Sequence, residues 1–366
     1  MISTNNWRQK TAANMLKLIN PFICNLPIIS INDISFSESI SCSTFEIRKR
    51  YSVSGYPNLG KGFSSDEAKL SGLMESLEMC CIESLLPTEW YCSSLKSYLN
   101  SSSKECFSSN IKLSTFLGED RKIELDELVV AEGKPKSLQS KSLTNGLASG
   151  QSLDDCIVHS VYELIERHVI GSSTRIKILP QHLNEEFQCF LSSLEHSGLT
   201  CSIYIRGDFA NTVTIESHII DKSLSVVPYF YGGIGFGCSG NSDIAIARAI
   251  SEAFQCLSVS KSMYLNTFGL GTDLTGPIYG YANEFNEFHA SSIHLVPYIM
   301  RCEASSTSND DFLLSNYNRV HMHNELIQDL QIQGINQFNY IVLTDIELPF
   351  IVVRCFIDQL SNSYGI

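Results

Sequence analysis

Basic residues and long apolar runs are both scarce in this sequence. Lys and Arg number 26 against 39 Asp and Glu, so the formal net charge is −13. Nucleic acids and anionic membranes are held by a basic surface, so we expect neither as a partner. The sequence has no run of about 18 apolar residues and no signal-peptide core, which predicts a cytoplasmic protein without a membrane span.

The motifs of several common chemistries are also absent. The 13 cysteines form no CxxC pair, and an odd number without an export signal favours free, mostly buried thiols. His321 and His323 lack HExxH or similar spacing, so no zinc site is expected. No GxxxxGK(S/T) motif occurs, and GGIGFG (232–237) matches a dinucleotide fingerprint only weakly. We therefore expect neither a P-loop nor a Rossmann domain.

The 366 residues, 43% of them hydrophobic, are enough for a sizeable core. Segments that alternate apolar and polar residues predict antiparallel strands, at 26–30, 123–130, 199–209, 211–220, 223–231, 339–346 and 350–357. Helices are expected at 66–86, 152–170, 244–264 and 323–332. The stretch 50–65 is expected to be a strand followed by a glycine-containing turn, and 232–243 a glycine-rich turn; no internal repeat of about 20–50 residues is evident.

This succession of strands and helices predicts an α+β fold rather than a doubly wound sheet. The first 45 residues look irregular apart from one short strand. We therefore expect an N-terminal segment (1–45) followed by one catalytic domain (46–366).

Three of the expected helices confine their polar side chains to one stripe, spaced i, i+4 and i+7 over an arc of about 60°. The stripes are Ser71, Glu75 and Glu78; Asp155, His159, Glu163 and Glu166, with Arg167 at the border; and Arg248, Glu252 and Gln255. Lysine occurs only at the helix ends, although a solvated face normally mixes both signs of charge. A solvated face explains each stripe singly, but together they indicate carboxylates that need another partner.

A hard cation suits clustered carboxylates. Mg²⁺ takes one or two carboxylates from a protein and its other ligands from water and phosphate. Lys61, Arg167 and Arg248 would then bind phosphate oxygens. The stripes therefore predict a site for Mg²⁺ and a nucleoside triphosphate. His159, one turn before Glu163, fits a buried, hydrogen-bonded histidine better than a residue of this site.

The same residues lie in three motifs that follow the order found in the YcaO-domain family. The motifs are GKG–SxxxExxE, NGxAxGxSxxxAxxxxxxExxER and GxGxxxxxxxAxxRAxxEAxQ, and the second keeps its pattern except for Cys156 in place of Ala. From residue 60 to 255 the sequence resembles this family. The resemblance implies a YcaO-type ATP-binding fold in which carboxylates from several helices hold Mg²⁺, with ATP and Mg²⁺ as cofactors.

The resemblance also implies a role for each matching residue. The nucleotide site would consist of Lys61, Ser71, Glu75, Gln151, Asp155, Arg167, Arg248 and Gln255. The metal ligands would be Glu75, Glu78, Glu163, Glu166 and Glu252. Gln151 and Asp155 stand where the family often has Asn and Glu. No protein nucleophile is implied, and no catalytic residue is assigned.

Members of the family phosphorylate a backbone amide oxygen of a peptide after a nucleophile has attacked that carbonyl. The resemblance implies such an enzyme, a cyclodehydratase that forms azoline rings or an enzyme of thioamidation, acting on a ribosomally made peptide or protein. An E1-like (ThiF-like) or TfuA-type partner protein is implied, and family members are often homodimers.

Two departures from the family pattern favour an alternative. Met79 follows the last Glu of the first motif, where many relatives have Arg, and the chain ends SNSYGI rather than in a proline-rich tail. The alternative is a non-catalytic accessory protein of this fold, which binds ATP or a partner and assists another modification enzyme, for example on a ribosomal protein. An unrelated acidic structural protein is a third candidate.

Overall fold

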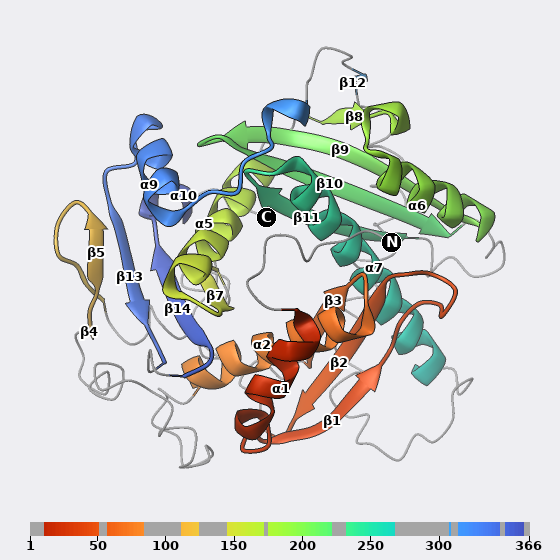
Figure 1. Ribbon diagram of the computed structural model, residues 1–366, viewed down its shortest axis with the longest axis horizontal. Coiled ribbons are helices and arrows are strands. Elements are labelled where there is room, and N and C mark those ends of the chain that lie inside the picture. Colours follow the sequence, from red (N-terminus) through yellow and green to blue (C-terminus); the bar gives the residue numbers. More distant parts are fainter. Residues whose placement is uncertain are drawn as a thin grey trace.

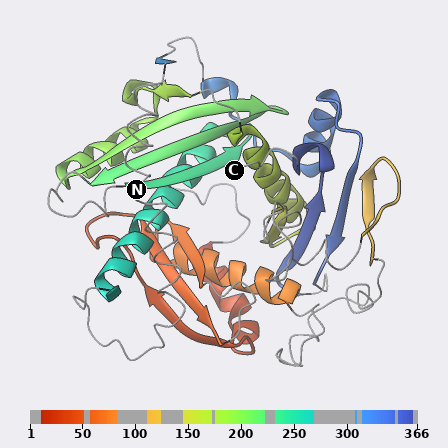
Figure 2. The same cartoon turned by 180° about the vertical axis from the view of Figure 1, so that it is seen from behind.

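The computed structural model describes residues 11–50, 57–83, 111–123, 145–171, 175–221, 232–267, 307–308, 314–344 and 348–361. Three mostly antiparallel sheets surround the helices α2, α5 and α7 (Figure 1 and, from behind, Figure 2). The predicted α+β class is confirmed. No helix in the described ranges has both the length and the apolar character that crossing a membrane requires.

The first sheet has the order β1-β2-β3, with β1 (Ile28–Asp33), β2 (Ser43–Lys49) and β3 (Asn58–Gly62). Helix α2 (Ser65–Glu83) follows β3 directly and packs on β2 and β3. Helix α1 (Ala12–Ile23) packs on α2, and the Thr11 side chain caps its first turn. The irregular N-terminal segment that we expected is therefore wrong at α1, whereas the one strand expected there, at 26–30, overlaps β1. The division at residue 45 stays a prediction, although it falls within β2.

The second sheet has the order β11-β10-β9-β8-β12. Its strands are β8 (Ile176–Ile178), β9 (Leu199–Phe209), β10 (Thr212–Asp221), β11 (Gly232–Ser239) and β12 (Thr307–Ser308). Helix α6 (Glu185–His196) packs on β9, and α7 (Ser242–Thr267) follows β11 and packs on β10 and β11. Helix α7, the third helix with a polar stripe, thus lies against the strand that precedes it, as α2 does.

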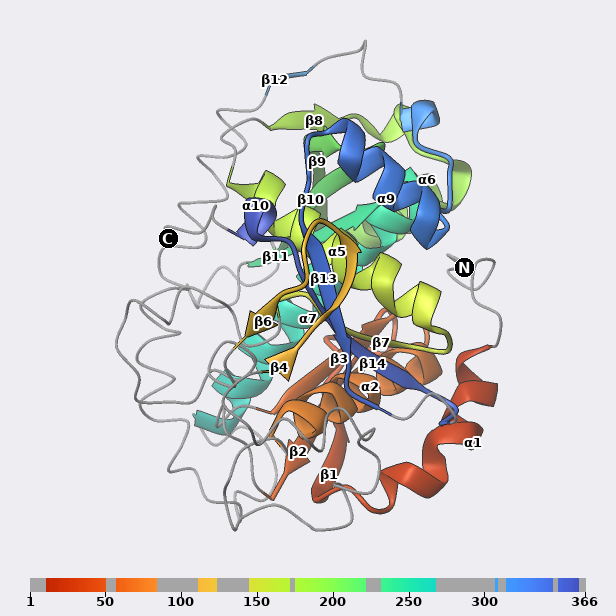
Figure 3. The ribbon, with the colours of Figure 1, turned by 90° about the vertical axis from the view of Figure 1, so that its left-hand side faces the viewer.

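The third sheet has the order β5-β13-β14-β7 and is seen from its outer side in Figure 3. Its strands are β5 (Ser114–Leu117), β7 (Leu147–Gly150), β13 (Phe338–Val342) and β14 (Ile351–Phe356). Helix α5 (Leu153–Ile170) follows β7 and packs on β7 and β14, while α9 (His323–Ile332) and α10 (Asp358–Ser361) pack on α5. Two short strands, β4 (Ile111–Lys112) and β6 (Lys122–Ile123), pair separately.

All four expected helices are confirmed, as α2, α5, α7 and α9. The expected turns are wrong at 58–62 and 232–239, which form β3 and β11. The strand expected at 223–231, and all but the first residue of the one at 123–130, lie outside the described residues.

Glycine is needed in these two strands because a helix backbone lies directly on each of them. A Cβ atom at Gly60 would be 1.9 Å from the carbonyl oxygen of Ala68 in α2. A Cβ atom at Gly235 would be 2.2 Å from the carbonyl oxygen of Ala249 in α7. The glycines that looked like turn signals therefore allow close helix–strand packing.

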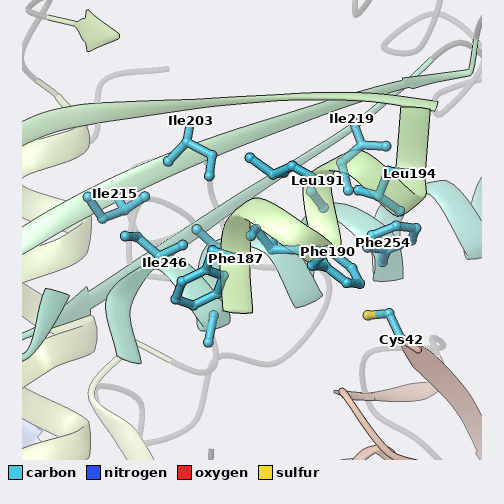
Figure 4. Close-up of a cluster of buried hydrophobic side chains, with 14 of the residues drawn as sticks. Cys42, Phe187, Phe190, Leu191, Leu194, Ile203, Ile215, Ile219, Ile246 and Phe254 are labelled. Atoms are coloured by element: carbon cyan, nitrogen blue, oxygen red, sulfur yellow. The ribbon is translucent and has the colours of Figure 1, made fainter. Parts of the chain in front are cut away.

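Each of three hydrophobic clusters joins two of the sheets. The first cluster combines α1 and α2 with β7 and other residues of the third sheet. The third cluster combines α5 and α9 with two residues of the second sheet, Cys238 of β11 and Ala210 in the turn between β9 and β10. The second cluster contains Cys42, directly before β2, together with side chains of α6, α7, β9 and β10 (Figure 4). This packing arranges the sheets around the inner helices.

We expect Gly60→Ala to destabilise the protein by at least about 2 kcal/mol, because the helix backbone cannot move away from the added Cβ without disturbing the cluster behind it. Denaturant unfolding measures the effect. Gly171→Ala is the control, since Gly171 is exposed and its φ of −60° suits alanine. Equal stability of the two variants would contradict the close packing of α2 on β3.

Candidate functional site

The stripe of α2 meets that of α5 through their carboxylates. Burial is the main cause that raises the pKa of Glu78 to about 8; the hydrogen bond from Ser149 opposes this rise, and the charges of Glu75 and Glu163 contribute to it. Burial also raises the pKa of Glu75 to about 7. Asn58 Nδ2 donates to Glu75 Oε1 at 3.3 Å, and Ser149 Oγ donates to Glu78 Oε1 at 2.5 Å. Glutamates far apart in the sequence therefore lie within electrostatic range of each other.

The stripe of α5 meets that of α7 in the same way. Burial raises the pKa of Glu163 to about 8, with Arg167 and Arg248 lowering it and Glu166 and Glu252 raising it. Burial likewise raises the pKa of Glu166, and the charge of Glu252 adds to the effect. Glu252 itself forms an ion pair with Lys61 of β3. Each of the five predicted metal ligands thus lies within electrostatic range of at least one other.

The predicted cations lie beside these acids. Arg248 Nη1 donates to His159 Nδ1 at 2.6 Å, and its charge acts on Glu163 and Glu166. Lys61 acts on Glu75 and Glu166 as well as pairing with Glu252. The third predicted cation is Arg167 of α5, whose charge acts on Glu163. With Arg248 of α7 and Lys61 of β3, it makes the junction a mixture of positive and negative charges.

The remaining predicted residues lie on the same elements with fewer contacts. Ser71 and Gln255 are half-buried on α2 and α7. Gln151 has a buried Oε1 atom without a hydrogen bond. Asp155 is exposed at the start of α5, where Ser152 Oγ donates to it at 2.7 Å. The role of every predicted residue in binding stays a prediction.

Sequence reasoning missed several residues of this junction. Arg354 of β14 is buried, which lowers its pKa to about 10, while the charge of Glu163 raises it. Lys49 and Glu83 form an ion pair of 2.6 Å with both side chains 1% exposed. A basic residue inside the apolar run IVVRCF was a usable signal for Arg354. Lys49 carried no such signal, because its partner lies 34 positions further along the chain.

The residues fit a divalent cation with phosphate. Four buried or half-buried glutamates have raised pKa values, so among the described residues they lack full compensation by positive charge, and the Gln151 oxygen is a spare acceptor. Within the described ranges, no group of three or more His, Cys, Asp or Glu side chains is arranged to hold a metal by itself. Mg²⁺ needs only one or two carboxylates beside water and phosphate. Fold and junction together define an α+β protein with a site suited to a cation and an anionic ligand.

Comparison with known proteins identifies the family. The model of the YcaO family, described as YcaO cyclodehydratase, ATP- and Mg²⁺-binding, matches residues 126–361. The chain belongs to this family. An uncharacterized protein of Mycobacterium tuberculosis, matched in two strains, is 22% identical over 266 residues, which cover 65% of this chain and 58% of that protein. The chain therefore spans less than two thirds of the length of these curated relatives.

Solved structures share the fold. YcaO from Methanopyrus kandleri bound with AMPPCP and Mg²⁺ has a TM-score of 0.64 at 15% identity, over 96% of this chain and 91% of that one. A heterocyclase in complex with substrate and cofactor has a TM-score of 0.63 at 14% identity, over 97% and 53%. The E. coli microcin synthetase McbBCD complex with pro-MccB17 bound has a TM-score of 0.56 at 12% identity, over 89% and 86%. These matches confirm the predicted YcaO-type fold.

The raised pKa values predict that the ligand-free protein loses stability as the pH rises. An unfolded chain releases these protons near pH 4.5, whereas the folded protein keeps those of Glu78 and Glu163 up to about pH 8. The folded state therefore binds more protons between these values, and its free energy of unfolding falls as the pH rises through them.

Thermal unfolding at about pH 5.5 and pH 8.5 tests this expectation. Glu78→Gln should reduce the drop in Tm by about 2 °C, because the amide cannot ionise. Glu186→Gln, at an exposed position of α6, should follow the parent. Parallel curves for parent and Glu78→Gln would show that this carboxyl does not ionise in that range.

Proposed function

We propose that this protein uses Mg²⁺ and ATP to activate a backbone amide of a peptide or protein. The observation that carries the proposal is the meeting of Glu75, Glu78, Glu163, Glu166 and Glu252 from three helices with the cations Lys61, Arg167 and Arg248. Membership of a family described as ATP- and Mg²⁺-binding supports it.

The chemistry requires positioning and charge neutralisation rather than a protein nucleophile. An amide oxygen is a poor leaving group until it carries a phosphoryl group, which ATP supplies. The glutamates of the three stripes would hold Mg²⁺, and Arg167, Arg248 and Lys61 would bind phosphate oxygens. Ser71, Gln151, Asp155 and Gln255 would complete the nucleotide site. Lys61 would exchange part of its pairing with Glu252 for a phosphate oxygen.

The nucleophile decides the product. A Cys, Ser or Thr side chain of the substrate attacks the preceding carbonyl carbon, and loss of the activated oxygen as phosphate leaves an azoline ring. The sum is ATP and peptide giving ADP, phosphate and a peptide short of one water. With sulfide as the nucleophile the carbonyl oxygen is replaced by sulfur, giving a thioamide. We favour azoline formation, and the description of the family as cyclodehydratases supports it.

A partner protein would bring the substrate. The microcin synthetase that shares this fold is a McbBCD complex with pro-MccB17 bound, which supports a peptide substrate and a protein partner. An E1-like (ThiF-like) or TfuA-type protein is the expected kind of partner.

Calorimetry of ATP binding with and without Mg²⁺ tests the proposed site. The parent should bind ATP only weakly without Mg²⁺, and Glu78→Gln should weaken Mg²⁺-dependent binding at least about tenfold, since it removes one charge from the cation site. Glu186→Gln is the control. A folded parent that binds no ATP would contradict the proposal and favour the accessory protein.

The proposed product can be read by mass spectrometry of a Cys- and Ser-containing peptide incubated with the protein, ATP, Mg²⁺ and its partner. Loss of one water per phosphate released indicates azoline formation, and exchange of oxygen for sulfur in the presence of sulfide indicates a thioamide. An unmodified peptide in a complex that binds Mg²⁺ and ATP would leave the nucleotide site intact and overturn the enzymatic activity.

A further inference from the structure

Three stretches of the chain align with one another at constant offsets and without a gap. They are 60–78, 148–166 and 237–255, and each runs from a β-strand through a short turn into a helix. Each helix has an Asp at the same place in its first turn, as Asp66, Asp154 and Asp243. Each also has a small residue at the same later position, as Gly72, Ser160 and Ala249.

The alignment superimposes the three polar stripes. The middle position is always glutamate, as Glu75, Glu163 and Glu252. The last position holds Glu78, Glu166 and Gln255, and the first holds Ser71, His159 and Arg248. We expected no internal repeat of about 20–50 residues, and these three stretches lie further apart than that in the sequence. The shared strand–helix geometry makes the equivalence visible.

The three stretches also have equivalent places in the fold. Strands β3, β7 and β11 each lie at the edge of their own sheet, and the helix that follows packs on its strand. Figure 1 shows the three resulting units around a common centre. Each of the three hydrophobic clusters lies between two of these units.

The contacts between units run in one direction around this centre. Lys61 of β3 pairs with Glu252 of α7, and Ser149 of β7 donates to Glu78 of α2. Cys238, at the equivalent position of β11, lies within electrostatic range of Glu166 of α5. In each case the strand residue of one unit pairs with, or lies within electrostatic range of, a stripe glutamate of a neighbouring unit. A cyclic pattern of this kind is expected of three related units around an axis.

We propose that the site is the centre of three equivalent strand–helix units and that His159 is a positioning residue within it, one that holds Arg248. Its place in the stripe matches those of Ser71 and Arg248. The inference rests on the proposed function only in that Arg248 is taken to bind phosphate. It replaces our interpretation of His159 as a histidine outside the site.

The hydrogen bond defines what His159 does. Arg248 Nη1 lies 2.6 Å from His159 Nδ1, and a guanidinium can only donate. His159 Nδ1 must therefore be unprotonated, with the ring proton on Nε2. The bond ties Arg248 to α5, where its charge acts on Glu163 and Glu166. Without it, the long Arg248 side chain is free to turn towards Glu252 on its own helix, one turn away.

The tautomer of His159 can be read without any ligand. In protein labelled with ¹⁵N-histidine, the signal lost in His159→Asn is assigned to His159. We expect Nδ1 to be unprotonated in the parent, and we expect this to change in Arg248→Met, which removes the donor. A protonated Nδ1 in the folded parent, or a signal indifferent to Arg248→Met, would overturn the inference.

Binding of Mg²⁺ and ATP by calorimetry tests the positioning role. His159→Leu should weaken affinity about tenfold, the usual effect of losing a hydrogen bond to a charged group. His159→Asn should restore most of it, since the amide oxygen can accept from Arg248. His182→Leu, at an exposed histidine outside the three units, is the control, and thermal unfolding checks that each variant is folded.

A double variant separates positioning from a merely structural role. In the Arg248→Met background, His159→Leu should cause no further loss, because the two residues act as one unit. Equal affinity of parent and His159→Leu, or a full additional loss in the double variant, would overturn the inference. If the parent itself binds no ATP, the proposed function fails, and the tautomer measurement still decides whether His159 holds Arg248.

Discussion

The burial of several carboxylates at one junction is the constraint on which the rest of this structure depends. Glu78 lies near Glu75 and Glu163, and Glu166 lies near Glu252. Removing such charges from water is unfavourable unless cations or protons accompany them. Lys61, Arg167, Arg248 and Arg354 supply part of the compensation from four different elements. A divalent ion with bound phosphate would supply the remainder in the proposed function.

The close packing of helices on strands makes this junction possible. Glycines in β3 and β11 let α2 and α7 lie against the strand backbones, at positions where a Cβ atom has no room. The stripes of these helices are thereby directed away from their own sheets and towards the neighbouring unit. The hydrophobic clusters between the sheets hold this orientation, because each of them bridges two units.

The three related units share one geometry but differ in the residues at the first and last positions of their stripes. This difference explains how the same arrangement can bind groups of both charges in the proposed function. Glutamate at every middle position keeps the centre acidic, while Arg248 makes the third unit cationic at its first position. His159 can accept a hydrogen bond, whereas Arg248, its counterpart in the third unit, can only donate one. In the proposed function, small differences among equivalent positions give a site for both a cation and an anion.

The sequence alone determined α2, α5 and α7 with their polar stripes, α9 and the family, whereas α1, α6 and α10 were not predicted. The i, i+4, i+7 spacing of Glu75, Glu163 and Glu252 with their neighbours is a local property, so periodicity and motif order were sufficient to predict it. The tertiary structure decided which residues meet. Lys61 finds Glu252 and Ser149 finds Glu78 only after the sheets have packed. The strand glycines were misread as turns because glycine permits both, and only a helix lying on the strand distinguishes the two. The partner of His159 was hidden for a similar reason, since contacts between distant segments leave no local pattern.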